Sequence, residues 1–305
     1  MNRTFDLLTV LGPTASGKTR LGVELGRKLN GEIISADSRQ VYRGMDIGTG
    51  KDLEEYGEIP FHLIDIVEPG EEFSLFEFQR RCLEAIRQIR GRGRLPVLVG
   101  GTGLYLDAVL RRYRLAEVPV NPALRAELSS LPMEALIQRL LELKPNPHNT
   151  TDFRDREHLI RAIEIAAGEK QAAPADLPDF PPVTPLTFGI YWQRETLRKR
   201  IEIRLRQRLD QGLIEEVERL RDRGVSFRTL ENYGLEYRFV AWFLQGRMDR
   251  EELFRQLLQA ICAFAKRQRT WFGRMERHGI PIHWLEGEKD PCAEALAVIE
   301  KNPPP

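Results

Sequence analysis

The stretch Gly12-Pro13-Thr14-Ala15-Ser16-Gly17-Lys18-Thr19 matches the pattern G-x-x-x-x-G-K-S/T at every fixed position. The apolar run 7–11 precedes it and predicts a buried strand, and leucines at helical spacing follow it. A strand, a glycine-rich loop and a helix in this order are the context of a phosphate-binding loop. Its backbone N–H groups can face one anion, while Lys18 adds positive charge and Thr19 offers a hydroxyl to Mg²⁺. The stretch therefore predicts a site for a di- or triphosphate, but not the fate of that ligand.

Composition narrows the class of protein without naming a partner. The chain has 305 residues, of which 42% are hydrophobic and 30% charged, as is usual for one large or two modest globular domains. The formal net charge of +1 does not indicate a polyanionic ligand, so any nucleic-acid surface must be local. We expect no signal peptide and no transmembrane span. The widely spaced cysteines, Cys82, Cys262 and Cys292, fit neither disulfide pairing nor metal binding, which suits the cytoplasm.

A second predicted strand, 32–36, ends at Asp37. In an open parallel sheet, ligands meet the residues at the carboxyl ends of the strands, so we expect Asp37 near the phosphate loop. A carboxylate there can bind Mg²⁺ through water or act as a general base. The alternative is a turn or helix-capping aspartate, since Asp37-Ser38 is also good capping chemistry.

Further strands and helices alternate up to about residue 113. Residues 62–66 and 96–99 read as strands, and residues 76–89 as a helix between them. The second of these strands leads into a glycine-rich turn with Thr102 at its centre, which would let the backbone approach a ligand. The pattern predicts an α/β fold, with a parallel sheet like that of P-loop NTPases and helices on both faces.

The pattern then changes, and it divides the chain into four predicted parts. Residues 1–115 form the first part of the catalytic core. Residues 116–185 show helical periods and then prolines, which predicts a small all-helical insertion and a semi-rigid linker. Residues 186–290 complete the core with a strand at 187–192 and add C-terminal helices, and residues 291–305 form a tail.

A long helix predicted over 195–221 carries an unusual row of cations. Arg200, Arg204 and Arg208 follow each other at a spacing of four, beside the apolar stripe, and none has an acid three or four positions away. Like charges at this spacing repel by about 0.2–0.5 kcal/mol per pair. The row therefore predicts an anion outside the helix. A solvated face is the alternative.

A second helix runs from about residue 253 into the segment 266–277, which is rich in basic residues. Five of them, with Trp271 and Phe272 among them, suggest contact with a nucleic-acid backbone. The two aromatic residues are equally compatible with a place in the core. The basic residues are Lys266, Arg267, Arg269, Arg274 and Arg277.

Taken together, these motifs resemble the tRNA dimethylallyltransferases, and the resemblance runs from Leu8 to about Trp284. The enzymes of this family prenylate the adenosine just 3′ of the anticodon. Beside the phosphate loop, the resemblance is carried by the segments 34–38, 40–42, 44–49, 62–65, 99–105, 161–164, 265–268 and 270–272.

The resemblance implies a reaction. Dimethylallyl diphosphate would bind with its diphosphate on the loop 12–19 and Mg²⁺, and N6 of the adenosine at tRNA position 37 would attack C1 of the allyl group. Asp37 matches the general base and Thr19 the Mg²⁺ ligand. Thr102 matches a residue where the two substrates meet, and Arg204 an arginine near the diphosphate.

The resemblance also implies a tRNA surface for the anticodon stem-loop, on a protein expected to be monomeric. The residues predicted to contact tRNA are Asp37, Ser38, Arg39, Gln40, Arg125, Glu157, His158, Leu159, Ile160, Arg161, Arg238, Lys266 and Arg267. The sequence departs from the usual family residues at 152–155, 236–239 and 261–262, which leaves the tRNA contacts near these positions open.

Three other functions are compatible with parts of the sequence. A small-molecule P-loop kinase would use Lys18 and Thr19 on ATP and Asp37 on the acceptor hydroxyl. A prenyltransferase acting on free adenine nucleotides would need no basic helices. An RNA-binding protein without activity would have no need of Lys18, Thr19 and Asp37 together.

Overall fold

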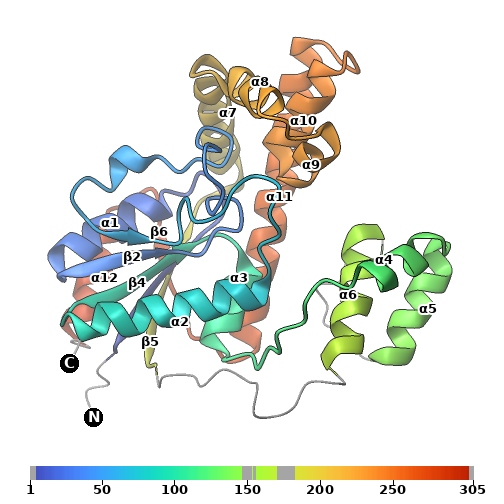
Figure 1. The fold of residues 1–305 in the computed structure, drawn as a ribbon. Coiled ribbons are helices and arrows are strands. Elements are labelled where there is room, and N and C mark those ends of the chain that lie inside the picture. Colours follow the sequence, from blue (N-terminus) through green and yellow to red (C-terminus); the bar gives the residue numbers. More distant parts are fainter. Residues whose placement is uncertain (1–4, 146–152, 154–155, 170–182, 302–305) are drawn as a thin grey trace. The chain divides into compact units, whose positions relative to one another are not determined.

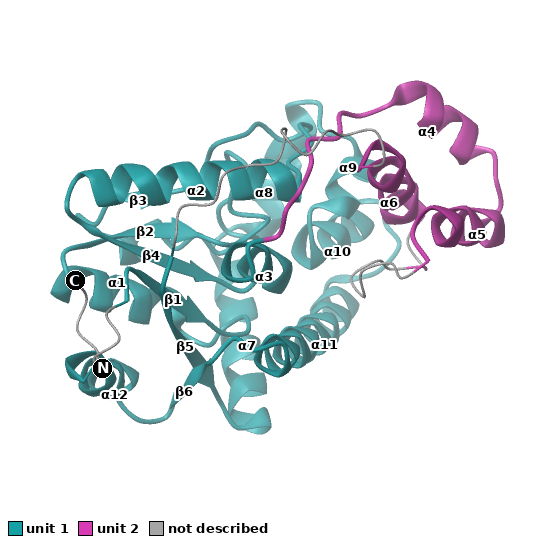
Figure 2. Cartoon of the chain, turned by 90° about the horizontal axis from the view of Figure 1, so that it is seen from below, with its two compact units in different colours: residues 1–112, 181–305 teal, residues 113–180 magenta. Residues whose placement is uncertain are grey.

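The computed structural model describes residues 5–145, 153, 156–169 and 183–301. The chain divides into two compact units, residues 1–112 with 181–305 and residues 113–180 (Figure 2). The larger unit holds the sheet and the phosphate loop. None of the helices in the described ranges is long and apolar enough to cross a membrane.

The larger unit is built on a parallel sheet of six strands in the order β3-β2-β4-β1-β5-β6. β1, β2 and β4 are buried along their whole length, as expected for parallel strands covered on both faces. The bounds are β1 Leu7–Leu11, β2 Gly31–Ser35, β3 Phe61–His62, β4 Leu95–Gly100, β5 Pro185–Tyr191 and β6 His283–Glu286. The predicted α/β fold is confirmed, and β6 adds an edge strand that the sequence analysis did not predict.

Helices cover both faces of this sheet (Figure 1). On one face, α1 (Lys18–Lys28) and α12 (Pro291–Glu300) share an apolar cluster with the strands, which includes Leu21, Leu25 and Ile299. On the other lie α2 (Leu75–Gly91) and α3 (Gly103–Leu110). Residues 291–300 are therefore not the predicted tail, because their apolar side chains pack on α1 and the sheet.

A group of helices forms a second apolar cluster in the larger unit. The predicted helix 195–221 is in fact two helices, because Gly212 has a φ of 99° and begins a new one. The five helices are α7 (Arg194–Asp210), α8 (Leu213–Asp222), α9 (Phe227–Asn232), α10 (Leu235–Leu244) and α11 (Arg250–Arg277).

The predicted strand 62–66 is also shorter than expected, because Leu63 and Asp65 have positive φ angles of 63° and 55°.

The smaller unit contains α4 (Pro122–Ser129), α5 (Met133–Leu143) and α6 (Arg156–Glu169). These helices have an apolar core of their own, which includes Leu128, Leu140 and Ile163. The all-helical insertion is therefore confirmed. Most of the predicted proline-rich linker lies outside the described residues, and Pro185 begins β5.

Candidate active site

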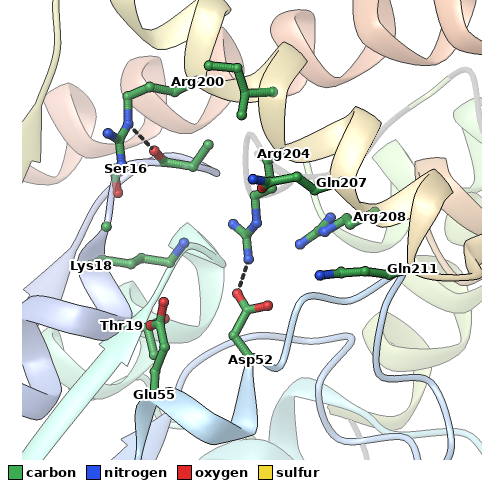
Figure 3. A pocket seen from close by; sticks show the side chains of 13 residues that line it. Ser16, Lys18, Thr19, Asp52, Glu55, Arg200, Arg204, Gln207, Arg208 and Gln211 are labelled. Carbon is green, nitrogen blue, oxygen red and sulfur yellow. Dashed lines mark hydrogen bonds and ion pairs between the residues drawn. The ribbon is translucent and has the colours of Figure 1, made fainter.

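The phosphate loop joins β1 to α1 and opens onto a cavity of about 360 Å³ (Figure 3). Residues 15–19 form one wall, and the opposite wall comes from α7. Asp52 and Glu55, at the short 3₁₀ helix Leu53–Glu55, complete the lining. The lining residues are Ala15, Ser16, Gly17, Lys18, Thr19, Asp52, Glu55, Arg200, Ile203, Arg204, Gln207, Arg208 and Gln211.

All three arginines of the α7 row line this cavity, and each has a partner on another element. The Arg204 guanidinium forms an ion pair with Asp52. Arg208 donates to Glu236 over 3.1 Å, and Arg200 donates to the carbonyl oxygen of Ala15 over 2.9 Å. The prediction that anions outside the helix face the row is thus met by Asp52 and Glu236. A solvated face is excluded for Arg208, whose exposed fraction is 7%.

Positive charge is concentrated in the cavity, and it affects the pKa of Lys18. Burial, together with the nearby Arg204 and Arg208, lowers the pKa of Lys18 to about 8, against the opposing influence of Asp37. Burial, together with Arg204, also lowers the pKa of Arg208. Because these groups repel each other, an anion placed among them would be stabilised by several cations at once.

The backbone of the phosphate loop is held by one side chain that follows β5 and one from α7. Trp192, just after β5, donates from Nε1 to the carbonyl oxygen of Ser16 over 2.9 Å. The Arg200 guanidinium lies 4.1 Å from the centre of the Trp192 ring while it binds Ala15. The carbonyl oxygens of Ala15 and Ser16 are thus each bound by a side chain from outside the loop, which restricts the orientation of this part of the cavity wall.

Asp37 and Thr102 lie at the carboxyl ends of two neighbouring strands, β2 and β4. The Thr102 backbone N–H donates to the carbonyl oxygen of Ala36 over 3.2 Å, and its hydroxyl accepts from the Ser38 N–H over 3.1 Å. The Asp37 carboxylate accepts from the Arg39 N–H over 2.9 Å and stays half-buried. The structure therefore brings these two predicted residues together at the edge of the sheet that carries the loop.

The loop between β2 and β3 is held in place by a buried glutamate. Glu216 on α8 accepts hydrogen bonds from the backbone N–H groups of Asp46 and Ile47 at 2.8 Å and of Gly48 at 3.0 Å. The Tyr237 hydroxyl donates to the same carboxylate over 2.6 Å, and burial together with Glu216 raises the pKa of Tyr237. Glu216 thus fixes the segment that leads to Asp52.

Gly50 lies where this loop meets the arginine row. Its φ of +60° favours glycine, and an added Cβ would lie 1.8 Å from Arg208 and 2.5 Å from Arg204. Its carbonyl oxygen accepts from the Gln40 side chain over 3.1 Å. A side chain at position 50 would displace the two guanidinium groups from the cavity wall.

The residues predicted to contact tRNA in the larger unit differ in their exposure. Lys266 and Arg267 are exposed on α11, whereas Ser38 and Arg39 are half-buried. Gln40 is 7% exposed, and its side chain bridges Ser35 and Gly50, so it supports the site from within and offers no surface contact. The expectation for the Gln40 side chain is therefore corrected. Arg238 donates to the carbonyl oxygen of Glu231 over 2.8 Å.

In the smaller unit, Glu157 and His158 are exposed, but Leu159 and Ile160 are buried in the apolar core. The side chains of these last two residues are therefore structural, which corrects the prediction for them. Two further predicted contacts, Arg125 and Arg161, share a buried carboxylate. Arg125 lies 2.9 Å and Arg161 2.6 Å from the carboxylate of Glu164, which joins α4 to α6.

The fit of a Mg²⁺ ion can be judged from the donor groups around the loop. In the described part of the chain, no group of three or more His, Cys, Asp and Glu side chains could hold a metal ion. Thr19 lines the cavity with Asp52 and Glu55, so oxygen donors are present. This donor set suits Mg²⁺, which commonly takes one or two protein oxygens and completes its shell with phosphate and water.

Several residues of the site were not predicted from the sequence. Trp192, Glu216 and Gln268 reach the loops across more than 160 positions of the chain. Asp52 and Glu55 lie in a segment that reads only as a glycine-punctuated loop. Gln268 lies in the motif segment 265–268, but nothing in that pattern indicates its partners, because these roles depend on elements that only the fold brings together.

Together the parallel sheet, the phosphate loop and its cation-lined cavity define a P-loop protein that binds a phosphorylated substrate. Residues 40–275 match the family model described as IPP transferase, so the chain belongs to that family. The chain is 61% identical to tRNA dimethylallyltransferase 1 of Geotalea daltonii over 97% of its own length and 95% of that protein. It is 62% identical to tRNA dimethylallyltransferase 2 of Syntrophotalea carbinolica over 97% and 99%.

A solved structure agrees with this assignment. The fold is similar to that of the tRNA isopentenylpyrophosphate transferase from Bacillus halodurans, with a TM-score of 0.70 and 34% identity, over 99% of this chain and 97% of that one. The resemblance noted from the motifs is therefore confirmed at the level of the family.

Proposed function

We propose that this protein transfers the dimethylallyl group of dimethylallyl diphosphate to N6 of the adenosine at tRNA position 37. One observation carries the proposal: Lys18, Arg204 and Arg208 line a single cavity beside the strand ends that hold Asp37 and Thr102. Anion binding and base chemistry are thus available side by side. The names of the relatives, which are 61% and 62% identical over nearly the whole chain, support the same reaction.

The leaving group is diphosphate. As the bond between C1 and the diphosphate oxygen breaks, its electron pair passes to the diphosphate, and the new C–N bond forms from the N6 electron pair. The phosphate loop and the three cations stabilise the charge that develops on the departing oxygen. A neutral amine is a poor nucleophile, so the reaction depends on how readily the diphosphate departs. Stabilising the charge on the diphosphate is therefore the main contribution of the cavity to the rate.

The acceptor amine must lose a proton when it forms the bond. Asp37 is the proposed base: the Arg39 N–H fixes its carboxylate at the end of β2. It orients the amine in line with the leaving group and takes the proton, which then passes to solvent. Thr102, hydrogen-bonded to the Ser38 N–H, holds the neighbouring wall.

Mg²⁺ is the proposed cofactor, with Thr19 as its protein ligand. When bound, the ion would neutralise charge on the diphosphate. Lys18, Arg204 and Arg208 bind and orient the same group from the protein side. Before the substrate arrives, Arg204 forms an ion pair with Asp52.

The proposed tRNA surface includes the exposed face of α11. Lys266, Arg267 and Arg269 are exposed there, and Phe264 is 39% exposed beside them. Cations interleaved with an accessible ring suit a nucleic-acid backbone and unstacked bases. We further propose that the substrate element is the anticodon stem-loop and that the protein works as a monomer in the cytoplasm.

The test is direct. Purified protein is incubated with dimethylallyl diphosphate, Mg²⁺ and an unmodified tRNA that carries adenosine at position 37, and the digested RNA is examined by mass spectrometry. We expect one dimethylallyl group on that adenosine. Transfer to free adenosine monophosphate but not to tRNA, or ATP turnover with no prenyl transfer, would replace the proposal with one of its alternatives.

A further inference from the structure

Gln268 connects two loops of the site that come from different strands. Its Oε1 accepts from the Thr14 N–H over 2.9 Å, and its Nε2 donates to the carbonyl oxygen of Gly101 over 2.9 Å. Thr14 belongs to the phosphate loop, and Gly101 precedes Thr102 at the end of β4. One side chain thus spans the donor side and the acceptor side of the proposed reaction.

The chemistry of the two contacts fixes the orientation of this amide. The Thr14 N–H can only donate, and the Gly101 carbonyl oxygen can only accept, so a group with one acceptor and one donor is required. Gln268 is 7% exposed, so neither contact is readily replaced by water. An added Cβ at position 101 would lie 2.5 Å from Nε2, which shows how closely the side chain approaches the turn.

The helix that carries Gln268 is itself held against the same turn. Trp271, three residues further along α11, would lie 2.3 Å from a Cβ at position 103, so its ring packs on the backbone where α3 begins. Ala265 and Phe272 on the same face are buried, while Lys266, Arg267 and Arg269 face solvent. The amide is therefore presented by a rigid element and not by a mobile loop.

We propose that Gln268 is a positioning residue, which sets the distance between the diphosphate on the phosphate loop and the acceptor beside Thr102. The inference rests on the proposed function. Gln268 acts through Thr14 and Gly101 and does not itself touch the reacting atoms. Its loss should reduce the alignment of the two bound substrates more than the affinity for either, because misplacement by about 1 Å can cost on the order of 100-fold in rate.

The test uses the full-length protein with two substitutions that differ in chemistry. Gln268→Met removes both hydrogen bonds at similar volume. We expect kcat to fall by about 30- to 100-fold, with KM for dimethylallyl diphosphate and for tRNA each within about threefold of the wild type. Gln256→Met is the matched control. It makes the same change at a half-buried glutamine near the N-terminal end of α11 and should leave kcat unchanged.

Gln268→Glu separates positioning from packing. An ionised carboxylate accepts from Thr14 but repels the Gly101 carbonyl oxygen, whereas a protonated one restores both contacts. The kcat of this variant relative to the wild type should therefore rise as the pH falls, while the ratio for Gln268→Met stays flat. A kcat unchanged in both variants, or a loss in the Glu variant that does not recover at lower pH, would overturn the inference.

The inference and the proposed function fail in distinguishable ways. If the wild type itself transfers no prenyl group to tRNA, the proposed function is wrong. The connection that Gln268 makes between the two loops can then be tested without substrate, by measuring hydrogen exchange of the Thr14 amide by NMR. Faster exchange in Gln268→Met than in Gln256→Met would support the link, and equal rates would refute it.

Discussion

Arg204 on α7 and Asp52 before the 3₁₀ helix form an ion pair inside the cavity of the phosphate loop. The Asp52 carboxylate holds the guanidinium that the proposed mechanism assigns to the substrate diphosphate. Arg204 therefore has an anionic partner before the substrate arrives, and the diphosphate must compete with it or share it.

Replacing the arginine should weaken the use of the prenyl donor. We expect Arg204→Ala to raise KM for dimethylallyl diphosphate by about 10-fold or more, since a charge-assisted hydrogen bond contributes about 1.5–3 kcal/mol. The dissociation constant for tRNA should change by less than about twofold, within the range of a surface substitution. Steady-state kinetics and filter binding measure the two. Arg206→Ala, an exposed arginine paired with Glu202 on the same helix, is the control. A larger effect on tRNA binding would assign the arginine row to RNA.

Replacing the Asp52 carboxylate should have the opposite effect on KM for dimethylallyl diphosphate. Asp52→Asn removes the competing charge but keeps the volume, so KM for dimethylallyl diphosphate should fall by a few-fold, in a titration at constant Mg²⁺ and tRNA. An increase in KM instead would mean that Asp52 contributes to binding the substrate, for example through the metal ion, and does not merely compete with it.

Asp37→Asn tests the base. The amide keeps the size and the hydrogen bond from the Arg39 N–H but cannot take a proton. We expect kcat to fall by about 100- to 10,000-fold, which is the usual contribution of a general base, while tRNA binding is retained. Single-turnover kinetics with saturating tRNA isolate the chemical step. Turnover near the wild-type value would remove Asp37 from this role.

The low pKa of Lys18 predicts a pH dependence of donor binding. Because burial and the nearby arginines lower this pKa to about 8, Lys18 loses its charge in the free protein as the pH rises through that value. Affinity for dimethylallyl diphosphate should therefore be level below pH 8 and decline above it, with a proton taken up on binding. Calorimetry at about pH 8.5 in buffers of different ionisation enthalpy would detect the proton. Lys18→Arg, which stays charged, should bind without proton uptake.

Glu216 is predicted to matter for stability more than for chemistry. Glu216→Ala would leave three backbone N–H groups and the Tyr237 hydroxyl without their acceptor. We expect a loss of about 3 kcal/mol in the free energy of unfolding, since each orphaned buried donor costs about 1–3 kcal/mol and water replaces part of it. Urea denaturation measures the change. Glu218→Ala, an exposed neighbour on α8, should stay within about 0.5 kcal/mol of the wild type.

Local patterns were enough to predict much of this protein. The phosphate loop, the buried strands and the three helices of the insertion follow from glycine placement and apolar periodicity, which act over a few residues. The arginine row was visible because missing partners at helical spacing can be counted along the chain. Asp37 was placed correctly because parallel strands present their carboxyl ends at one edge.

The tertiary structure alone decided which distant residues complete the site. Gln268 meets Thr14 across 254 positions, and Glu216 meets Asp46 across 170. It also decided that Gln40, Leu159 and Ile160 lie inside the protein, and that residues 291–300 pack as a helix on α1. The physical reason is that burial and hydrogen-bond partners depend on which surfaces meet. Apolar periodicity indicates which face of its own helix or strand a residue lies on. Which residue of another element it contacts is set only when the chain is folded.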